Sequence, residues 1–220
     1  VEVYIDALTH YGLKLYSWMD LQVEMGGKRF QYVVLDPSYK YACACCVDGF
    51  YQQYLWSRER DYVLRLGTYN PVCRVPPEVE VSRQLERGVV GFVLSPDRHG
   101  FSLLDRKLGF IYEVVESEGM LLYLKGFSVR EYSALRESYR FEKVLVPLKY
   151  FRGNLDELLG FGEVYFVTDR PRDDLPLSRQ IYGSDSPYNG KGLWDSIPDP
   201  YNLDFYYRNF FELIARKIVR

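Results

Sequence analysis

Short apolar runs rich in β-branched and aromatic residues recur along the whole chain, and longer polar stretches with turn signals separate them. Runs of this kind predict buried β-strands. We expect eight strands, at residues 3–6, 32–35, 62–69, 89–94, 120–124, 143–146, 163–168 and 180–182. Their alternation with helix-length segments is typical of βαβ units, in which helices join parallel strands.

Helical periodicity and end signals predict the segments between the strands. Pro76 and Pro77 suit the start of a helix, and Gly88 suits its C-terminal cap. Apolar side chains at helical spacing, ending before Gly119, predict the next helix. Basic residues near the C-terminus complement the dipole of a last, amphipathic helix. The expected helices are at residues 78–87, 103–117, 128–138, 154–159 and 202–219.

The eight strand–helix repeats predict the fold class, a compact single-domain (β/α)8 barrel of the TIM type that spans residues 1–220. Such barrels need at least about 200 residues, so this chain would be an example with few insertions. A doubly wound open sheet is the alternative, but it would not need eight strands. We interpret the proline-rich residues 171–200 as loops over the barrel mouth and a lead-in to the last helix.

Composition limits the partners. The hydrophobic content of 47% is enough for a sizeable core, while the net charge of −2 and the pI of 5.8 create no field that recruits nucleic acid or an anionic membrane. No apolar run approaches the roughly 20 residues needed to span a bilayer. The first residues begin directly as a strand, without the features of a signal peptide. We therefore expect a cytoplasmic protein with no nucleic-acid or membrane partner.

Three of the four cysteines, Cys43, Cys45 and Cys46, crowd into one short segment, and Cys73 stands apart. The cluster lacks the paired C-x-x-C spacing of a zinc knuckle. We expect small buried residues in a reducing compartment, with a redox or soft-metal role as the alternative.

Two segments at opposite ends of the chain carry a resemblance. Residues 4–12 read Tyr-Ile-Asp-Ala-Leu-Thr-His-Tyr-Gly, and residues 181–188 read Ile-Tyr-Gly-Ser-Asp-Ser-Pro-Tyr. They resemble the first and last strands of an amidohydrolase-superfamily barrel, which normally end in His-x-His and in Gly-Ser/Thr-Asp. Residues 67–71 and 85–96 resemble the third and fourth strands of the amidohydrolase-related proteins that include aminocarboxymuconate-semialdehyde decarboxylase and related lactonases.

The resemblance implies chemistry at a metal held by histidines at the C-terminal ends of the strands, where the metal supplies hydroxide at neutral pH. In this chain Leu8 replaces the first histidine of the pair, and His10 remains alone. Lys125 stands where the fifth strand is expected to supply a histidine, and Pro147 or Leu148 where the sixth is. Because the chain has two histidines, we expect neither a His-rich zinc centre nor another cofactor.

The resemblance and the predicted strand ends give three catalytic candidates: Asp185 as a general base, with His10 and Lys125 stabilising negative charge. Each has an ordinary alternative. Asp185 would accept hydrogen bonds from the backbone N–H groups of its own turn. His10 would form a hydrogen bond within the barrel mouth, and Lys125 would form a salt bridge to Asp185 or Asp6. Asp6 and Asp36 also end strands, but nothing in the sequence fixes their separation for a Mg²⁺ site.

Three further residues are candidates for substrate binding. Arg98 and His99 follow the fourth predicted strand, at the functional face, and Arg170 could hold a carboxylate through two hydrogen bonds. The alternatives are a solvated loop for His99 and a surface ion pair of Arg170 with Asp169 or Asp173.

These observations leave three hypotheses. The first is a degenerate barrel, a non-catalytic scaffold that partners another protein or a second copy of itself. The second is a metal-independent, lactonase-like hydrolase, and the third is a decarboxylase-like enzyme that acts on a small carboxylic acid. An open pocket where the three catalytic candidates converge would favour an enzyme, whereas bulky side chains filling it would favour the scaffold.

Overall fold

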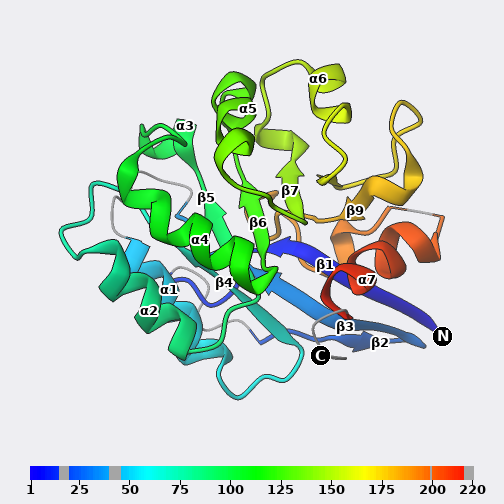
Figure 1. Cartoon of the computed structure of the whole chain (residues 1–220). Helices are drawn as coiled ribbons and strands as arrows, with labels where there is room; N and C mark the ends of the chain where they lie inside the picture. Colours follow the sequence, from blue (N-terminus) through cyan, green and yellow to red (C-terminus); the bar gives the residue numbers. More distant parts are fainter. Residues whose placement is uncertain (15–19, 40–45, 199, 216–220) are drawn as a thin grey trace.

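Eight parallel strands form a nearly closed barrel in the computed structural model, which describes residues 1–14, 20–39, 46–198 and 200–215 (Figure 1). Neighbouring strands follow in chain order, and a two-residue strand, β2, pairs antiparallel with the start of β3. The predicted (β/α)8 barrel is confirmed, and every expected strand overlaps an observed one. The strands are β1 (Glu2–Thr9), β2 (Glu24–Met25), β3 (Lys28–Leu35), β4 (Val63–Thr68), β5 (Gly91–Leu94), β6 (Leu121–Leu124), β7 (Val144–Pro147), β8 (Val164–Thr168) and β9 (Gln180–Tyr182).

Helices follow the strands and cover the outside of the barrel. None of those described has both the length and the apolar character that crossing a membrane requires. They are α1 (Cys46–Ser57), α2 (Pro77–Glu86), α3 (Pro96–His99), α4 (Gly109–Glu118), α5 (Val129–Ser138), α6 (Leu155–Leu159) and α7 (Asn209–Ala215). The expected helices at 78–87, 128–138 and 154–159 are confirmed within one residue at their ends.

The other helix predictions need correction. Helix α4 begins at Gly109 and not at 103, because the Asp105 side chain caps the N–H of Lys107 and turns the chain into a 3-10 turn over Arg106–Leu108. The last helix opens with a π-helical turn over Asp204–Arg208, and residues 216–219 of its predicted span lie outside the described residues.

Helix α1 was missed because its apolar residues do not form one stripe. Phe50 is fully buried, Tyr51 and Tyr54 are half-buried, and Leu55 is 62% exposed.

Strand alternation divides the core into two layers. Outward-facing side chains such as Phe92 and Leu122 pack under the helices. Inward-facing ones fill the barrel, and Phe210 and Leu213 of α7 close its N-terminal end. The inner layer includes Ile5, Ala7, Val34, Leu66, Val93, Leu121, Tyr123, Leu145, Val167 and Ile181.

The barrel closes between its first and last strands through few hydrogen bonds. A parallel β-bridge joins Thr9 and Ser186, and the N–H of Asp185 donates to the carbonyl of Leu8 at 2.8 Å. Gly183 permits this approach, since a Cβ atom there would lie 3.0 Å from Cβ of Leu8 on β1. Outside this seam lies a buried aromatic cluster that includes Tyr4, Phe30, Tyr182, Phe205 and Tyr206.

The same alternation delivers polar side chains to the C-terminal end of the barrel. On β6 the inner positions Leu121 and Tyr123 are followed two residues later by Lys125. Val34 of β3 is followed in the same way by Asp36, and Ile181 of β9 is followed four residues later by Asp185. As in other barrels of this type, the C-terminal end is therefore where a site can form.

Candidate functional site

His10 and Asp185 form a buried pair where the first and last strands meet. Nε2 of His10 lies 2.5 Å from Oδ1 of Asp185, and their side chains are 0% and 3% exposed. Nδ1 of His10 lies 3.3 Å from the backbone carbonyl oxygen of Asp36. Both ring nitrogens thus lie within hydrogen-bond distance of an oxygen atom. Asp185 reaches this position from a left-handed backbone conformation, with φ of 66°.

Lys125 pairs with Asp36 and not with Asp185 or Asp6, which corrects the alternatives drawn from the sequence. Its Nζ lies 2.6 Å from Oδ2 of Asp36, and both side chains are almost fully buried. The N–H of Ser38 donates to Oδ1 of Asp36 at 2.8 Å. Burial opposes the charge on Asp36, but the neighbouring Lys125 and His10 outweigh it and hold the pKa of this carboxyl below its ordinary value.

Both oxygens of Asp185 are already engaged. Besides His10 on Oδ1, Nζ of Lys149 lies 2.9 Å from Oδ2, and the Tyr150 hydroxyl donates to Oδ2 at 2.5 Å. Burial alone would raise the pKa of Asp185, yet the hydrogen bond and charge of His10, with the charge of Lys125 and the Tyr150 hydroxyl, hold it far below the usual range. A carboxylate stabilised in this way is a weak base.

Two tyrosine rings cover the buried charges. The Tyr188 ring stacks on the His10 ring at 3.9 Å between centroids, with an interplanar angle of 14°. Nζ of Lys125 lies 4.5 Å from the centre of the Tyr150 ring, and Cζ of Arg98 lies 5.3 Å from it. Such cation–π contacts favour cations over aromatic faces. The space above His10 and Lys125 is therefore occupied by aromatic side chains.

Beside this covered network lies a cavity of about 540 Å³, between the C-terminal ends of β1, β7, β8 and β9. Leu8 forms part of its wall, and Asp185 reaches it from the buried side. Its polar lining combines three cations with two carboxylates and three neutral side chains: Lys149, Arg170, Arg172, Asp169, Asp185, Thr168, Ser184 and Asn189. A larger cavity of about 890 Å³ lies at the N-terminal end, near Lys143 and α7, away from the His10–Asp185 pair.

The three predicted substrate-binding residues have different surroundings. Arg170 lines the cavity, is 69% exposed and lies 3.8 Å from Asp169, so the ion pair named as its alternative is present. Arg98 instead donates to the backbone carbonyl of Tyr39 at 2.9 Å. The solvated loop given as the alternative for His99 is not what the structure shows: both ring nitrogens are buried without a hydrogen-bond partner among the described residues, and burial with the charge of Arg98 lowers its pKa.

Sequence reasoning missed the partners of the predicted residues. Asp36 was discounted, although its position two residues beyond buried Val34 places it inside the barrel. Lys149 and Tyr150 lie on a 3-10 turn, Leu148–Tyr150, where strand alternation no longer indicates direction. Tyr188 lay in a proline-rich stretch that had been interpreted only as loops.

The donor set does not fit the divalent metal that the resemblance implies. Within the described ranges, no group of three or more His, Cys, Asp or Glu side chains could hold a metal ion. Leu8 offers no ligand, and the ammonium of Lys125 already brings a positive charge to Asp36. Asp185 would have to lose its N–H and O–H donors before binding a cation. Cys43 and Cys45 lie outside the described residues.

No protein-family model and no curated protein sequence matches the chain. Several solved structures do. An amidohydrolase II structure is 14% identical, with a TM-score of 0.64 over 96% of this chain and 99% of the other. A TIM-barrel protein from Bordetella bronchiseptica is 12% identical, with a TM-score of 0.59 over 86% and 79%.

A third structure, named as a 2-pyrone-4,6-dicarboxylic acid hydrolase from Acinetobacter baumannii with citric acid bound, is also 12% identical, with a TM-score of 0.55 over 96% of this chain and 92% of the other. The expected resemblance to the amidohydrolase superfamily is confirmed at the level of the fold.

Proposed function

From a barrel with the amidohydrolase-superfamily fold, we propose a protein that binds a small carboxylate at the barrel mouth without metal-dependent hydrolysis. In this proposal the barrel is degenerate as a hydrolase and acts as a binding scaffold, alone or with a partner subunit. The observation that carries it is the state of Asp185. Its two oxygens accept hydrogen bonds from His10, Lys149 and Tyr150, which occupy three of the roughly four lone-pair positions of a carboxylate and leave one, on Oδ1, for a metal or a substrate proton.

The buried charges support this proposal by balancing one another without a metal. Asp36 and Asp185 supply two negative charges, while Lys125 and Lys149, which contact them, supply two positive ones. Buried charges are tolerated when they are paired and hydrogen-bonded. The network therefore satisfies the charge balance that a dication would otherwise provide.

The three cations in the lining of the cavity support a carboxylate as the ligand. Arg170 and Arg172 line it together with Lys149, and guanidinium groups bind carboxylates through paired hydrogen bonds. The Acinetobacter baumannii structure, which holds citric acid in a similar fold, makes citrate a reasonable probe. A ligand carboxylate would compete with Asp169 for Arg170 and with Asp174 for Arg172.

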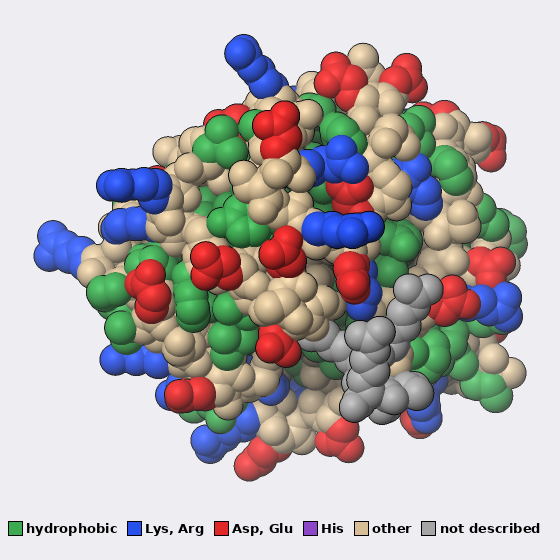
Figure 2. Space-filling model, viewed as in Figure 1, with side chains coloured by type: hydrophobic (Ala, Val, Ile, Leu, Met, Phe, Trp, Pro, Cys, Tyr) green, Lys and Arg blue, Asp and Glu red, His purple; other side chains and the backbone are tan. Residues whose placement is uncertain are grey.

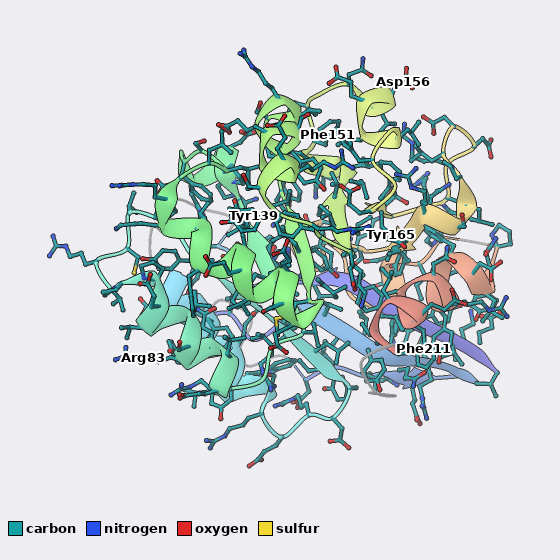
Figure 3. All side chains as sticks on the ribbon, in the orientation of Figure 1. Arg83, Tyr139, Phe151, Asp156, Tyr165 and Phe211 are labelled. Atoms are coloured by element: carbon teal, nitrogen blue, oxygen red, sulfur yellow. The ribbon has the colours of Figure 1, made fainter. Side chains whose placement is uncertain are left out.

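The experiment is isothermal titration calorimetry of the whole protein with citrate. We expect binding that the double variant Arg170→Ala, Arg172→Ala weakens at least about tenfold, or about 1.4 kcal/mol. The matched control is Arg83→Ala, an exposed arginine on α2, well away from the barrel mouth (Figure 3). An affinity for citrate that is unchanged in the double variant would contradict the proposed ligand site. Robust zinc-dependent hydrolysis of a lactone or ester would contradict the degenerate role.

A metal-independent, lactonase-like hydrolase is the second candidate, because Asp185 borders the cavity and Lys149, 55% exposed on its side chain, could stabilise an oxyanion. This reading requires Tyr150 or Lys149 to release Asp185 when substrate enters. Weak lactone hydrolysis that survives chelators and is abolished by Asp185→Asn would favour it.

A further inference from the structure

The deep part of the cavity at the barrel mouth is aliphatic. Leu8 and Val167, each 2% exposed, line it together with Pro147 and Leu148, and we call these four side chains the apolar floor. Gly183 lies between two of them, because a Cβ atom on this glycine would lie 2.4 Å from Cγ1 of Val167 and 3.0 Å from Cβ of Leu8. No side chain therefore separates Leu8 from Val167 there, and the two form one surface.

The polar side chains at the same depth are already hydrogen-bonded within the protein. The Thr168 hydroxyl donates to the backbone carbonyl of Arg170 at 2.7 Å. The Ser184 hydroxyl donates to Asp6 at 2.5 Å, and Asp185 accepts from three donors. A ligand that enters the deep part of the cavity therefore meets mainly aliphatic surface that is free to contact it.

Positive charge gathers at the opening of the same cavity. Lys149, Arg170 and Arg172 line it with side chains that are 55%, 69% and 41% exposed, and we call them the cationic opening. The ion pair of Arg170 with Asp169 is exposed and long, at 3.8 Å, so a ligand carboxylate can displace it at little cost. The cavity is thus apolar in its depth and cationic where it meets solvent.

None of the described aromatic side chains lines this cavity. Aromatic rings recognise flat ligands by stacking. The two tyrosines of the barrel mouth are used elsewhere, since Tyr188 stacks on His10 and Tyr150 covers Lys125. The volume of about 540 Å³ lies within the range of small-molecule sites, roughly 300–1,000 Å³. The lining therefore suits an alkyl chain better than a flat ring.

We propose that the ligand of this cavity is an aliphatic monocarboxylate, with its alkyl chain on the apolar floor and its carboxylate at the cationic opening. This inference rests on the proposed carboxylate function and adds the body of the ligand to it. Leu8, which stands where the resemblance expects a histidine, becomes a determinant of ligand specificity. A polyanion such as citrate binds more weakly, because its further carboxylates meet an aliphatic surface without donors.

The test is a calorimetric titration of the whole protein with butanoate, hexanoate and octanoate, with citrate for comparison. We expect the affinity to rise about two- to fourfold with each added methylene, because each one leaves water for the apolar floor. The heat-capacity change of binding should become more negative along the series. Octanoate should bind more tightly than citrate, and more tightly than phenylacetate, which has as many carbon atoms but a flat ring.

Leu8→Asn replaces the alkyl side chain with an amide of similar size. It should weaken octanoate binding at least about tenfold and leave citrate binding nearly unchanged. Leu213→Asn is the matched control, since Leu213 is a buried leucine of the same inner layer at the opposite end of the barrel. The chain-length series needs only the unmodified protein, so it remains decisive if Leu8→Asn does not fold.

The failures of the two proposals are distinguishable. Citrate binding that depends on Arg170 and Arg172, with alkanoate affinities that do not change with chain length, would overturn this inference and leave the carboxylate function in place. Octanol that binds as tightly as octanoate, with the double variant Arg170→Ala, Arg172→Ala unchanged in its affinity for octanoate, would overturn the carboxylate function itself. Phenylacetate that binds more tightly than octanoate would overturn the aliphatic ligand.

Discussion

Nε2 of His10 lies 2.5 Å from Oδ1 of Asp185, although 175 residues separate the two along the chain. The pair joins the end of the first strand to the turn after the last. Through Asp36 it continues to Lys125, and through Oδ2 of Asp185 it continues to Lys149. The mouth of this barrel is therefore organised around alternating charges, and predictions about single residues must take their partners into account.

Lys125→Met should destabilise the protein strongly. It leaves the Asp36 carboxylate buried without its ammonium partner, which typically costs about 3–5 kcal/mol. Lys149→Met is the matched control, since that lysine is 55% exposed and its ion pair should be worth less than about 1 kcal/mol. Urea denaturation of the two variants measures the difference. Equal losses would mean that the Lys125–Asp36 pair is not buried as described.

Asp185→Asn should change the acid limb of the stability profile. The pKa of Asp185 is lower in the folded protein than its ordinary value of 3.8, so its contribution is present above pH 4 and is lost as the pH falls below it. The asparagine variant lacks this titration, and we expect its stability to fall less steeply below about pH 4. Thermal unfolding followed by circular dichroism from pH 2 to 6 measures it; parallel profiles would contradict the assigned contacts.

Gly91→Ala should overpack the wall of the barrel. A Cβ atom at Gly91 would lie 2.2 Å from the backbone oxygen of Leu121 on the neighbouring strand. Overpacking of this kind costs about 1–3 kcal/mol. Gly162→Ala is the control, because nothing lies within 4 Å of the added atom, and we expect a change within about 0.5 kcal/mol. Chemical denaturation of both variants tests the β5–β6 register.

Leu8→His should not restore zinc-dependent hydrolysis. The new imidazole would face Asp185, whose oxygens are engaged by His10, Lys149 and Tyr150. Elemental analysis of the variant after incubation with zinc should show no stoichiometric metal, and lactone and amide assays should show no gain over the unmodified protein. One tightly bound zinc per chain with new activity would contradict our view of the donor set.

Much of the fold could be predicted because the burial pattern of each element can be recognised from a short stretch of sequence. Each barrel strand is a short apolar run, and the turn signals that bound it lie directly beside it in the sequence. The first three candidates, His10, Lys125 and Asp185, do meet at the C-terminal end, since strand ends in a parallel barrel share one rim.

The pairing of charges could not be predicted in the same way. Lys125 pairs with Asp36 and not with Asp185. This pairing depends on which inward-facing side chains lie within reach across the barrel, and the order of residues in the sequence carries little of that information. Tyr188 covers His10 from an irregular segment whose path depends on tertiary packing. On the face that Figure 2 shows, acidic and basic side chains are interspersed.

The seam between β1 and β9 also bears on how the chain folds. Strands β3 to β8 each pair with the next strand along the chain, so their contacts close comparatively short loops. The seam joins Thr9 to Ser186 and must close nearly the whole chain, which carries the largest loop-closure entropy. We expect it to form last. The His10–Asp185 pair would then exist only in fully folded molecules, and the stacked Tyr188 ring would give a spectroscopic signal of completed folding.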